Sequence, residues 1–407
     1  MQKVLIRAQS ATAPAISAAG TASQPSAAKS GPRKLLTDTF ELRLEDAGQQ
    51  LSDATDFTVI GVLGGQGVGK STIMSLLAGA PWSSDTSGGG AGLHEPPFAP
   101  QPPEAAFSAT HHTVGIDMFV SPERLLLLDT QALLSPSVLL ELQRRETSLP
   151  ADVQTHENLL ELQSLRLATL LLSVCHLVVC VHDVQLDPLS LRTLRVAQML
   201  RHRLPDISHL ALASPAAVAA ITASAAAVSA DVDCSPVVEY SPRLAFVFNR
   251  MPSSAFAPTQ QATLHAVLQR LFPRPERLAG LDHGGGNGNG GGGMAAGITG
   301  NDGGSGSGAG AGSGGGDAEG QSDENLSLLV LPENDGGVAS VCGSHRGFRP
   351  AAEAVRDVLL SVRRLPFGKS VSEREWLRGV GRMWELIRRS LLLADYNRAL
   401  QKLHCFA

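Results

Sequence analysis

The chain has 407 residues and a formal net charge of −5 at pH 7, from 33 Lys and Arg against 38 Asp and Glu. This balance gives no reason to expect direct binding to nucleic acid or to an anionic membrane. The five cysteines are scattered and form no C-x-x-C pair, which indicates reduced thiols and excludes a disulfide framework or a zinc site as the basis of the fold.

The first 37 residues contain Lys, Arg, many Ala and Ser, and no acidic residue. We expect residues 1–37 to be a disordered tail of a cytoplasmic protein. The alternative is a transit peptide for an organelle, because such peptides have the same composition. Residues 38–55 are predicted to be a short linker or helix before the first strand.

An apolar run from Phe57 to Leu63 leads into a loop with the G-x-x-x-x-G-K-S spacing of a phosphate-binding loop, the P-loop. Glycines in such a loop allow backbone N–H groups to wrap around phosphate oxygens, and the next helix presents its positive end to the anion. Lys70 is expected to reach the β- and γ-phosphates, and the Ser71 hydroxyl to ligate Mg²⁺. The predicted phosphate-binding residues are Gly64, Gly65, Gln66, Gly67, Val68, Gly69, Lys70, Ser71 and Thr72.

Residues 81–112 are rich in Pro, Gly and Ser, and we expect a long flexible loop there. A strand from Thr113 to Val120 and another over residues 124–128 follow. Asp129 comes directly after the second strand and is the candidate carboxylate for Mg²⁺. Thr113 is the candidate threonine that ligates the metal and senses a γ-phosphate. The predicted metal site therefore consists of Ser71, Thr113 and Asp129.

Beyond Asp129, predicted helices alternate with short apolar strands. One helix is expected to begin after Ser135, with that serine as its cap and Pro136 at its first position. The apolar run from Leu177 to Val181 is typical of a parallel strand that is buried on both faces. The other predicted helices are 157–172, 188–200, 259–272 and 351–364, and the other predicted strands are 244–248 and 326–331.

This alternation predicts an α/β fold, a P-loop NTPase of the G-domain type with a mainly parallel sheet, over residues 56–365. The Ala-rich segment 209–240 and the Gly-rich segment 284–325 are expected, like 81–112, to be flexible inserts. Residues 370–405 have the apolar spacing of an amphipathic helix. That pattern fits a helix packed on its own domain and a helix that binds a partner equally well.

The residues for hydrolysis and base recognition depart from those of active GTPases. Asp129 is not followed by the x-x-Gly-Gln that positions a γ-phosphate and a water, although Gln131 can act from a shifted register. Asn249 keeps the first residue of the Asn-Lys-x-Asp turn that reads guanine, but Pro252 replaces its carboxylate. We therefore expect Asn249 to contribute to a site for GTP or ATP, or the diphosphates, with Mg²⁺ and with slow hydrolysis or none.

Several of these motifs together resemble one protein family, that of the SMG-nine nonsense-mediated mRNA decay factors. The resemblance covers the chain from about Asp56 onward, apart from the low-complexity inserts, and Gly65, Val68, Thr72 and the Gly-rich insert depart from the family pattern. The segments that carry it are 60–71, Gly115-Ile116-Asp117, 128–131, Leu134-Ser135-Pro136-Ser137, 161–165, 174–176 and 376–396.

The resemblance implies a G-domain-like regulator that pairs with a second G-domain protein, SMG-eight, and joins the SMG-one kinase. On that basis we expect a nucleotide-binding scaffold subunit of the decay kinase complex rather than an enzyme, with bound nucleotide bracing the fold. The alternative is an active GTPase or ATPase switch, because Lys70, Ser71 and Asp129 are all present.

Overall fold

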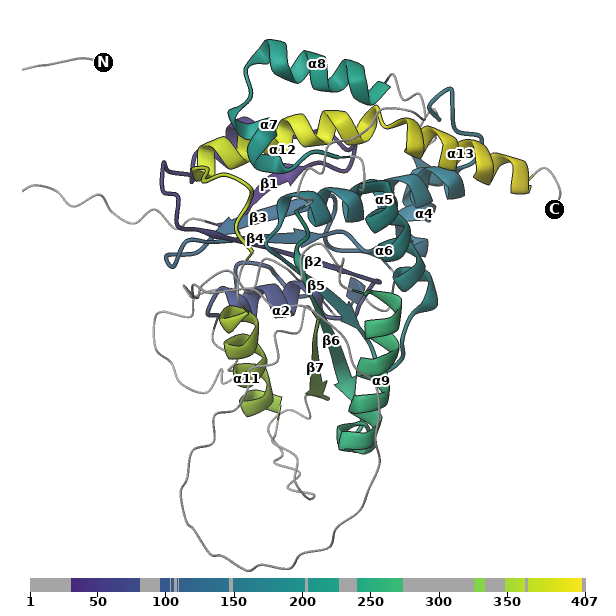
Figure 1. Cartoon of the computed structure of the whole chain (residues 1–407). Helices are drawn as coiled ribbons and strands as arrows, with labels where there is room; N and C mark the ends of the chain where they lie inside the picture. The colour runs from purple at the N-terminus through teal and green to yellow at the C-terminus, as the bar shows by residue number, and fades with distance from the viewer. Residues whose placement is uncertain are drawn as a thin grey trace, which may run out of the picture.

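A seven-stranded sheet, in the order β1-β3-β4-β2-β5-β6-β7, forms the centre of the described structure (Figure 1). The structure is a computed structural model that describes residues 31–80, 96–102, 104–105, 108, 110–145, 149–201, 204–226, 240–273, 326–333, 348–362 and 365–404. The predicted insert 284–325 lies outside these residues. The strands are β1 (Arg33–Leu36), β2 (Thr58–Gly64), β3 (Ile116–Val120), β4 (Leu125–Thr130), β5 (Leu177–His182), β6 (Arg243–Met251) and β7 (Leu326–Pro332).

Five neighbouring strands, from β4 through β2, β5 and β6 to β7, run parallel, whereas β1 and β3 are antiparallel to their neighbours. This arrangement confirms the predicted α/β class with a mainly parallel sheet. The described helices are α1 (Leu44–Gly48), α2 (Lys70–Leu77), α4 (Pro136–Arg144), α5 (His156–Val174), α6 (Pro188–Arg201), α7 (Ile207–Leu212), α8 (Pro215–Ala226), α9 (Pro258–Leu271), α11 (Phe348–Ser361), α12 (Glu373–Arg388) and α13 (Leu391–His404), with a 3₁₀ turn, η1, at Ser253–Phe256.

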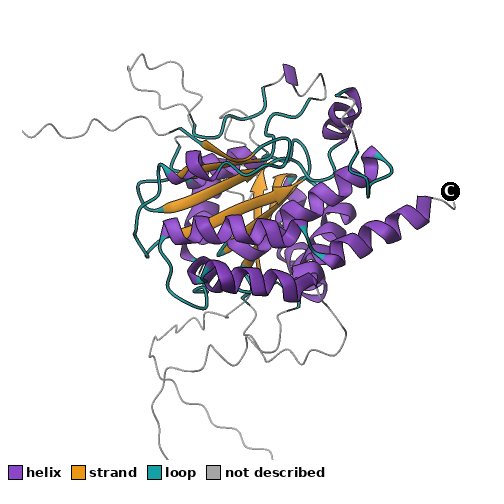
Figure 2. Ribbon diagram, turned by 90° about the horizontal axis from the view of Figure 1, so that it is seen from above, coloured by secondary structure: helices purple, strands orange, loops and turns teal. Residues whose placement is uncertain are grey.

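Helices cover both faces of the sheet, so that its central strands are buried on both sides (Figure 2). Along β5, Val179 and Val181 join an apolar cluster with residues of α2 and α11. Val178 and Cys180 point the other way, into a larger cluster that includes α5, α6 and α12. This two-sided burial explains why the central strands have continuous apolar sequences instead of an alternating pattern.

The predicted boundary between the N-terminal tail and the domain was partly wrong. Residues 33–36, predicted to belong to a disordered tail, form β1 and pair with β3, so the domain begins before residue 56. Between them and β2, only Leu44–Gly48 is helical. These residues were missed because four residues give too short a pattern to identify an edge strand whose partner lies about 80 positions away.

Two of the predicted flexible inserts contain packed structure. Phe98 is buried against α2, where its backbone N–H and C=O both bond to the Ser75 hydroxyl, at 3.1 and 2.8 Å. In the second insert, Ile207–Leu212 forms α7, and Leu210 is fully buried in the core. The next helix, α8, lies on the outside, as its small side chains and lack of a large apolar stripe predict.

The C-terminal region forms two helices, because α12 ends at Arg388 and α13 begins at Leu391. The apolar side of α12 packs on its own domain: Trp376 is fully buried and its indole Nε1 donates to the Val174 carbonyl at 2.9 Å. At the start of α12, Ser372 and Glu375 form a capping box. Of the two interpretations that the sequence left open for this segment, the buried Trp376 therefore supports a helix packed on its own domain for α12.

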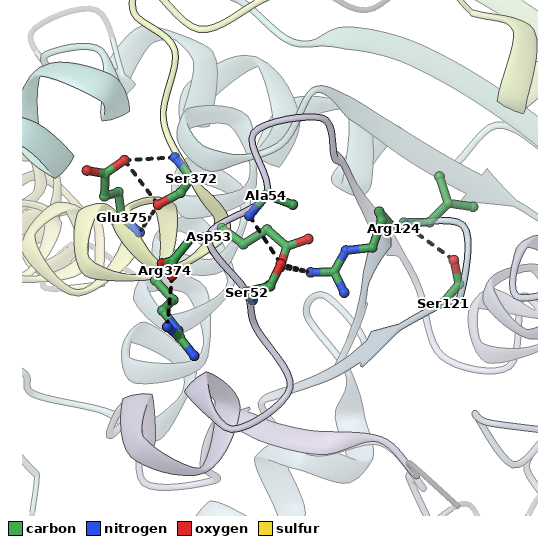
Figure 3. A network of polar contacts seen from close by, with 10 residues as sticks. Ser52, Asp53, Ala54, Ser121, Arg124, Ser372, Arg374 and Glu375 are labelled. Atoms are coloured by element: carbon green, nitrogen blue, oxygen red, sulfur yellow. Dashed lines mark hydrogen bonds and ion pairs between the residues drawn. The ribbon is translucent and has the colours of Figure 1, made fainter. Parts of the chain in front are cut away.

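A buried polar network fixes the first turn of α12 (Figure 3). The Glu373 carboxylate is fully buried and accepts hydrogen bonds from the Ser52 backbone N–H at 2.7 Å and the Ser52 hydroxyl at 3.1 Å. It also forms an ion pair with Arg124, which precedes β4. The network thus joins the C-terminal helix to the segments that lead into β2 and β4.

Candidate functional site

The predicted P-loop lies where β2 ends and α2 begins. Gly67 and Gly69 have φ values of 74° and 97°, in the left-handed region that favours glycine. A Cβ on Gly69 would lie 2.5 Å from Nδ2 of Asn249, so a side chain at this position would also force Asn249 to move. Helix α2 starts at Lys70, and Thr72 lies half-buried in its first turn. The N-terminal end of α2 therefore directs its backbone N–H groups towards the loop.

The three predicted metal ligands converge beside this loop. The Ser71 hydroxyl donates to Oδ2 of Asp129 at 2.6 Å, and the Thr113 hydroxyl donates to the same oxygen at 3.1 Å. The two hydroxyl oxygens lie 3.2 Å apart. Asp129 is the last but one residue of β4, next to β2 in the sheet, and this pairing brings its carboxylate to Ser71.

The chemistry of this oxygen cluster fits Mg²⁺. Oδ1 of Asp129 is buried and has no hydrogen-bond partner in the described structure, so one carboxylate oxygen is available to a ligand. Burial raises the pKa of Asp129, and the Ser71 hydrogen bond and the charge of Lys70 oppose this rise. No group of three His, Cys, Asp or Glu side chains gathers among the described residues. A single carboxylate with hydroxyls suits Mg²⁺ that takes its other ligands from phosphate and water.

Lys70, the first residue of α2, is buried, and its Nζ donates back to the Gly65 carbonyl of the loop at 2.7 Å. Burial lowers the pKa of Lys70 to about 8, and the nearby charge of Asp129 opposes this shift. A buried ammonium with one carbonyl partner lacks two of the acceptors it can use. A phosphate group fits this arrangement because its oxygens supply both the acceptors and the negative charge.

Asn249 lies beside the P-loop, and its Nδ2 donates to the Val68 carbonyl at 3.0 Å. The next residue, Arg250, has a φ of 56° and pairs with Asp183, its Nε donating to Oδ1 at 2.9 Å. The C-terminal end of β6 therefore braces the P-loop through Asn249, and the next residue forms a salt bridge with Asp183.

Gln66 connects the P-loop to α4, a contact that the sequence did not indicate. Its Oε1 accepts from the hydroxyls of Ser135 and Ser137 at 2.6 and 2.8 Å. Its Nε2 donates to the Thr110 carbonyl at 3.3 Å. Ser135 was predicted to cap α4, but its side chain makes no cap hydrogen bond, because Gln66 takes the hydroxyl instead.

Gln131 does not serve as an alternative water-positioning residue in this conformation. Its side chain is buried, and its Oε1 accepts from the backbone N–H of Gly115 at 2.9 Å. The backbone N–H of Gln131 in turn donates to the Gly115 carbonyl at 2.9 Å. This pair of bonds ties the end of β4 to the start of β3, so the carboxamide oxygen has a structural role.

Comparison with known proteins gives a consistent result. A nonsense-mediated mRNA decay factor SMG9 from Xenopus laevis is 28% identical over 381 residues, which is 90% of this chain and 66% of that protein. The Salmo salar factor of the same name is 27% identical over 87% of this chain and 64% of its own length. This chain is a homologue of the SMG9 decay factors.

A nematode SMG9 protein is also similar, although over less of the chain. The Caenorhabditis elegans SMG9 is 30% identical over 168 residues, or 41% of this chain. No protein-family model matches the chain. The chain spans slightly less than two-thirds of the length of the frog and salmon SMG9 proteins. In the described part, none of the helices is both long and apolar enough to cross a membrane.

Proposed function

We propose that this SMG9 homologue is a nucleotide-binding scaffold subunit in nonsense-mediated mRNA decay, and that it hydrolyses its nucleotide slowly or not at all. The observation that carries the proposal is the convergence of Ser71, Thr113 and Asp129 within 3.2 Å of one another, directly after the P-loop. The buried Lys70 ammonium has the Gly65 carbonyl as its hydrogen-bond partner and Oδ1 of Asp129 has none, and a phosphate group with Mg²⁺ would supply partners to both.

The backbone of residues 64–72 and the ammonium of Lys70 would hold the phosphates of GTP or ATP. Ser71, Thr113 and Asp129 would hold Mg²⁺, which when bound offsets the negative charge of the phosphates. The Oε1 of Gln131, the residue that the sequence offers for positioning an attacking water, is instead bonded to the backbone N–H of Gly115, which favours slow hydrolysis. Bound nucleotide would then stabilise the fold by mass action, because only the folded chain binds it.

The names of the relatives support a place in mRNA decay, and the resemblance to their family supports the choice of partners. We propose that the chain acts in the cytoplasm, pairs with a G-domain protein of the SMG-eight type and joins a kinase of the SMG-one type. The formal charge of −5 supports contact with proteins rather than with RNA.

The first experiment is an affinity purification of the tagged full-length chain from its own cells, with the bound proteins identified by mass spectrometry. We expect a large kinase and a second G-domain protein. A Lys70→Ala variant serves as a control for the nucleotide site, since weaker recovery of both partners would show that the brace matters for assembly. Absence of both partners from a folded wild-type sample would refute the scaffold.

The alternative function is an active GTPase or ATPase switch. The presence of Lys70, Ser71 and Asp129 favours it, because active enzymes of this type use these residue types. A multiple-turnover assay of the pure chain with GTP and with ATP separates the two proposals. We expect rates far below the ~1 s⁻¹ at which ordinary enzymes begin. A rate of that order, abolished by Asp129→Ala, would replace the scaffold with the switch.

A further inference from the structure

The side chain of Gln66 joins the P-loop to two other segments of the chain. Gln66 lies two residues after the end of β2 and is half-buried. Its Oε1 accepts hydrogen bonds from the hydroxyls of Ser135 and Ser137, and its Nε2 donates to the Thr110 carbonyl. A carboxamide can make four hydrogen bonds, and Gln66 makes three of them within the chain.

The partners of Gln66 fix the orientation of its carboxamide. The Thr110 carbonyl can only accept, so it requires the Nε2 side of the carboxamide. The Oε1 side then faces two serine hydroxyls, which can donate. Glutamate at this position would offer no donor to the carbonyl, and methionine would offer neither a strong donor nor a strong acceptor. The three bonds together therefore suit glutamine and neither of these replacements.

The two segments that Gln66 joins to the P-loop also contact each other. Ser137 lies in the first turn of α4, and its hydroxyl oxygen is 3.1 Å from Nδ1 of His111. Ser135 and Ser137 are both buried, and their hydroxyl oxygens lie 2.9 Å apart. The P-loop, the start of α4 and the segment at Thr110 thus share one network of polar contacts.

This network lies close in the chain to a predicted metal ligand. Thr113 is three residues beyond Thr110. Its hydroxyl donates to Oδ2 of Asp129 at 3.1 Å and lies 3.2 Å from the Ser71 hydroxyl. A chain that is held at residue 110 has little freedom at residue 113, because three residues span at most about 10 Å. Gln66 therefore restrains Thr113 through the backbone that joins residues 110 and 113.

We propose that Gln66 is a positioning residue of the nucleotide site, whose side chain holds Thr113 in place as a ligand of Mg²⁺ and so slows the release of Mg²⁺ and nucleotide. This role rests on the proposed nucleotide binding. Release of a bound nucleotide requires the segments around it to separate. Each hydrogen bond between those segments opposes the separation, and Gln66 contributes three.

The rate at which a fluorescent nucleotide leaves the full-length chain measures this role. N-methylanthraniloyl-GTP or its ATP counterpart is loaded with Mg²⁺ and chased with excess unlabelled nucleotide. Gln66→Met keeps the length of the side chain and removes its hydrogen bonds. It is expected to raise the dissociation rate at least about tenfold, since each lost bond accounts for a factor of roughly 2–10. Chelation of Mg²⁺ should remove most of this difference, because Thr113 then has no metal to hold, whereas a purely structural effect would persist.

Two further sets of variants test the partners of Gln66. Ser135→Ala together with Ser137→Ala removes two of the three bonds and should raise the rate several-fold. Added to Gln66→Met, the two serine changes should have little further effect, because the same bonds are already absent. Gln143→Met is the matched control, since this exposed glutamine of α4 bonds to Glu157 at 3.4 Å. It should change the rate by less than about twofold.

Hydrogen exchange of the backbone tests the restraint without a nucleotide. The Thr110 N–H donates to the Ala105 carbonyl at 2.9 Å, and the Leu133 N–H donates to the Gly64 carbonyl at 3.1 Å. Both amides should exchange faster in Gln66→Met than in the wild-type chain, because both lie in segments that Gln66 holds. Exchange in β5 should stay the same, which would show that the variant is folded.

Failure of this role and failure of the proposed function give different results. A wild-type chain that binds neither GTP nor ATP would overturn the proposed function, and with it the role of Gln66 in release. A wild-type chain that binds nucleotide but releases it as fast as Gln66→Met does would overturn the role of Gln66 alone. Unchanged exchange of the Thr110 and Leu133 amides in Gln66→Met would refute the restraint itself.

Discussion

Removal of the Glu373 carboxylate is expected to detach the first turn of α12 from the domain. Glu373→Ala eliminates the ion pair to Arg124 and the acceptor for two hydrogen bonds from Ser52. The glutamate is fully buried, whereas the Arg124 side chain is 32% exposed. Breaking a buried ion pair typically costs about 3–5 kcal/mol. We expect the lower end, about 3 kcal/mol, because Arg124 can recover part of its hydration.

The assay is equilibrium unfolding in guanidinium chloride, together with the thermal midpoint, both followed by circular dichroism. For a domain of this size, a loss of about 3 kcal/mol corresponds to a fall of roughly 6–12 °C in the midpoint. Glu373→Gln should cost less, about 1–2 kcal/mol, because its carbonyl still accepts the Ser52 backbone N–H.

Two controls make the reasoning testable. The double variant Arg124→Met with Glu373→Met leaves neither charge unpaired. Its loss in free energy of unfolding should therefore be smaller, by at least about 1 kcal/mol, than the summed losses of Arg124→Met and Glu373→Met measured singly. Arg374→Met removes the neighbouring, exposed pair with Asp53 and should change stability by less than about 0.5 kcal/mol. A cost below about 1 kcal/mol for Glu373→Ala, or full additivity in the double variant, would refute the account.

Three other predictions concern the site and the response to pH. Lys70→Ala should weaken GTP or ATP binding at least tenfold by calorimetry and remove nucleotide-dependent thermal stabilisation; unchanged affinity would contradict the assigned role. Asp129→Asn should make nucleotide affinity nearly independent of Mg²⁺, whereas an unchanged dependence would place the metal elsewhere. Burial lowers the pKa of His182 to about 4. The unfolded chain therefore binds the extra proton first, and stability should fall as the pH drops from about 6.5 to 4. His182→Phe, which keeps a ring beside Phe248, should flatten this fall, and an identical profile would exclude His182 as its source.

The elements that the sequence predicted well are those with strong local patterns. The strand from Leu177 and the unit of strand, glycine loop and helix around Lys70 combine apolar runs with unmistakable boundaries. The predicted neighbourhood of Asp129 and Ser71 follows from the end of a strand, and the pairing of β2 with β4 brings the two side chains together.

The features that were missed depend on contacts between distant residues. Nothing local marks Phe98 as buried, since its anchor is a hydroxyl on α2. The break between α12 and α13 has no Pro or Gly, and its local signal is Ser390, whose hydroxyl accepts from the Leu393 backbone N–H at 3.5 Å. The contact of Gln66 with Ser135 and Ser137 likewise joins segments about 70 residues apart.

The placement of α12 has a consequence for biosynthesis. Ser52 and Glu373, which bond to each other, are separated by 321 residues. At about 5–20 residues per second, a ribosome needs roughly 16–64 seconds to add that length of chain. In the later part of this interval, once α5 has been synthesised, the apolar surface of α5 that α12 later covers has no native partner and is open to aggregation. Nascent chains that stall before residue 373 should therefore be retained by chaperones, while chains released after α12 should not.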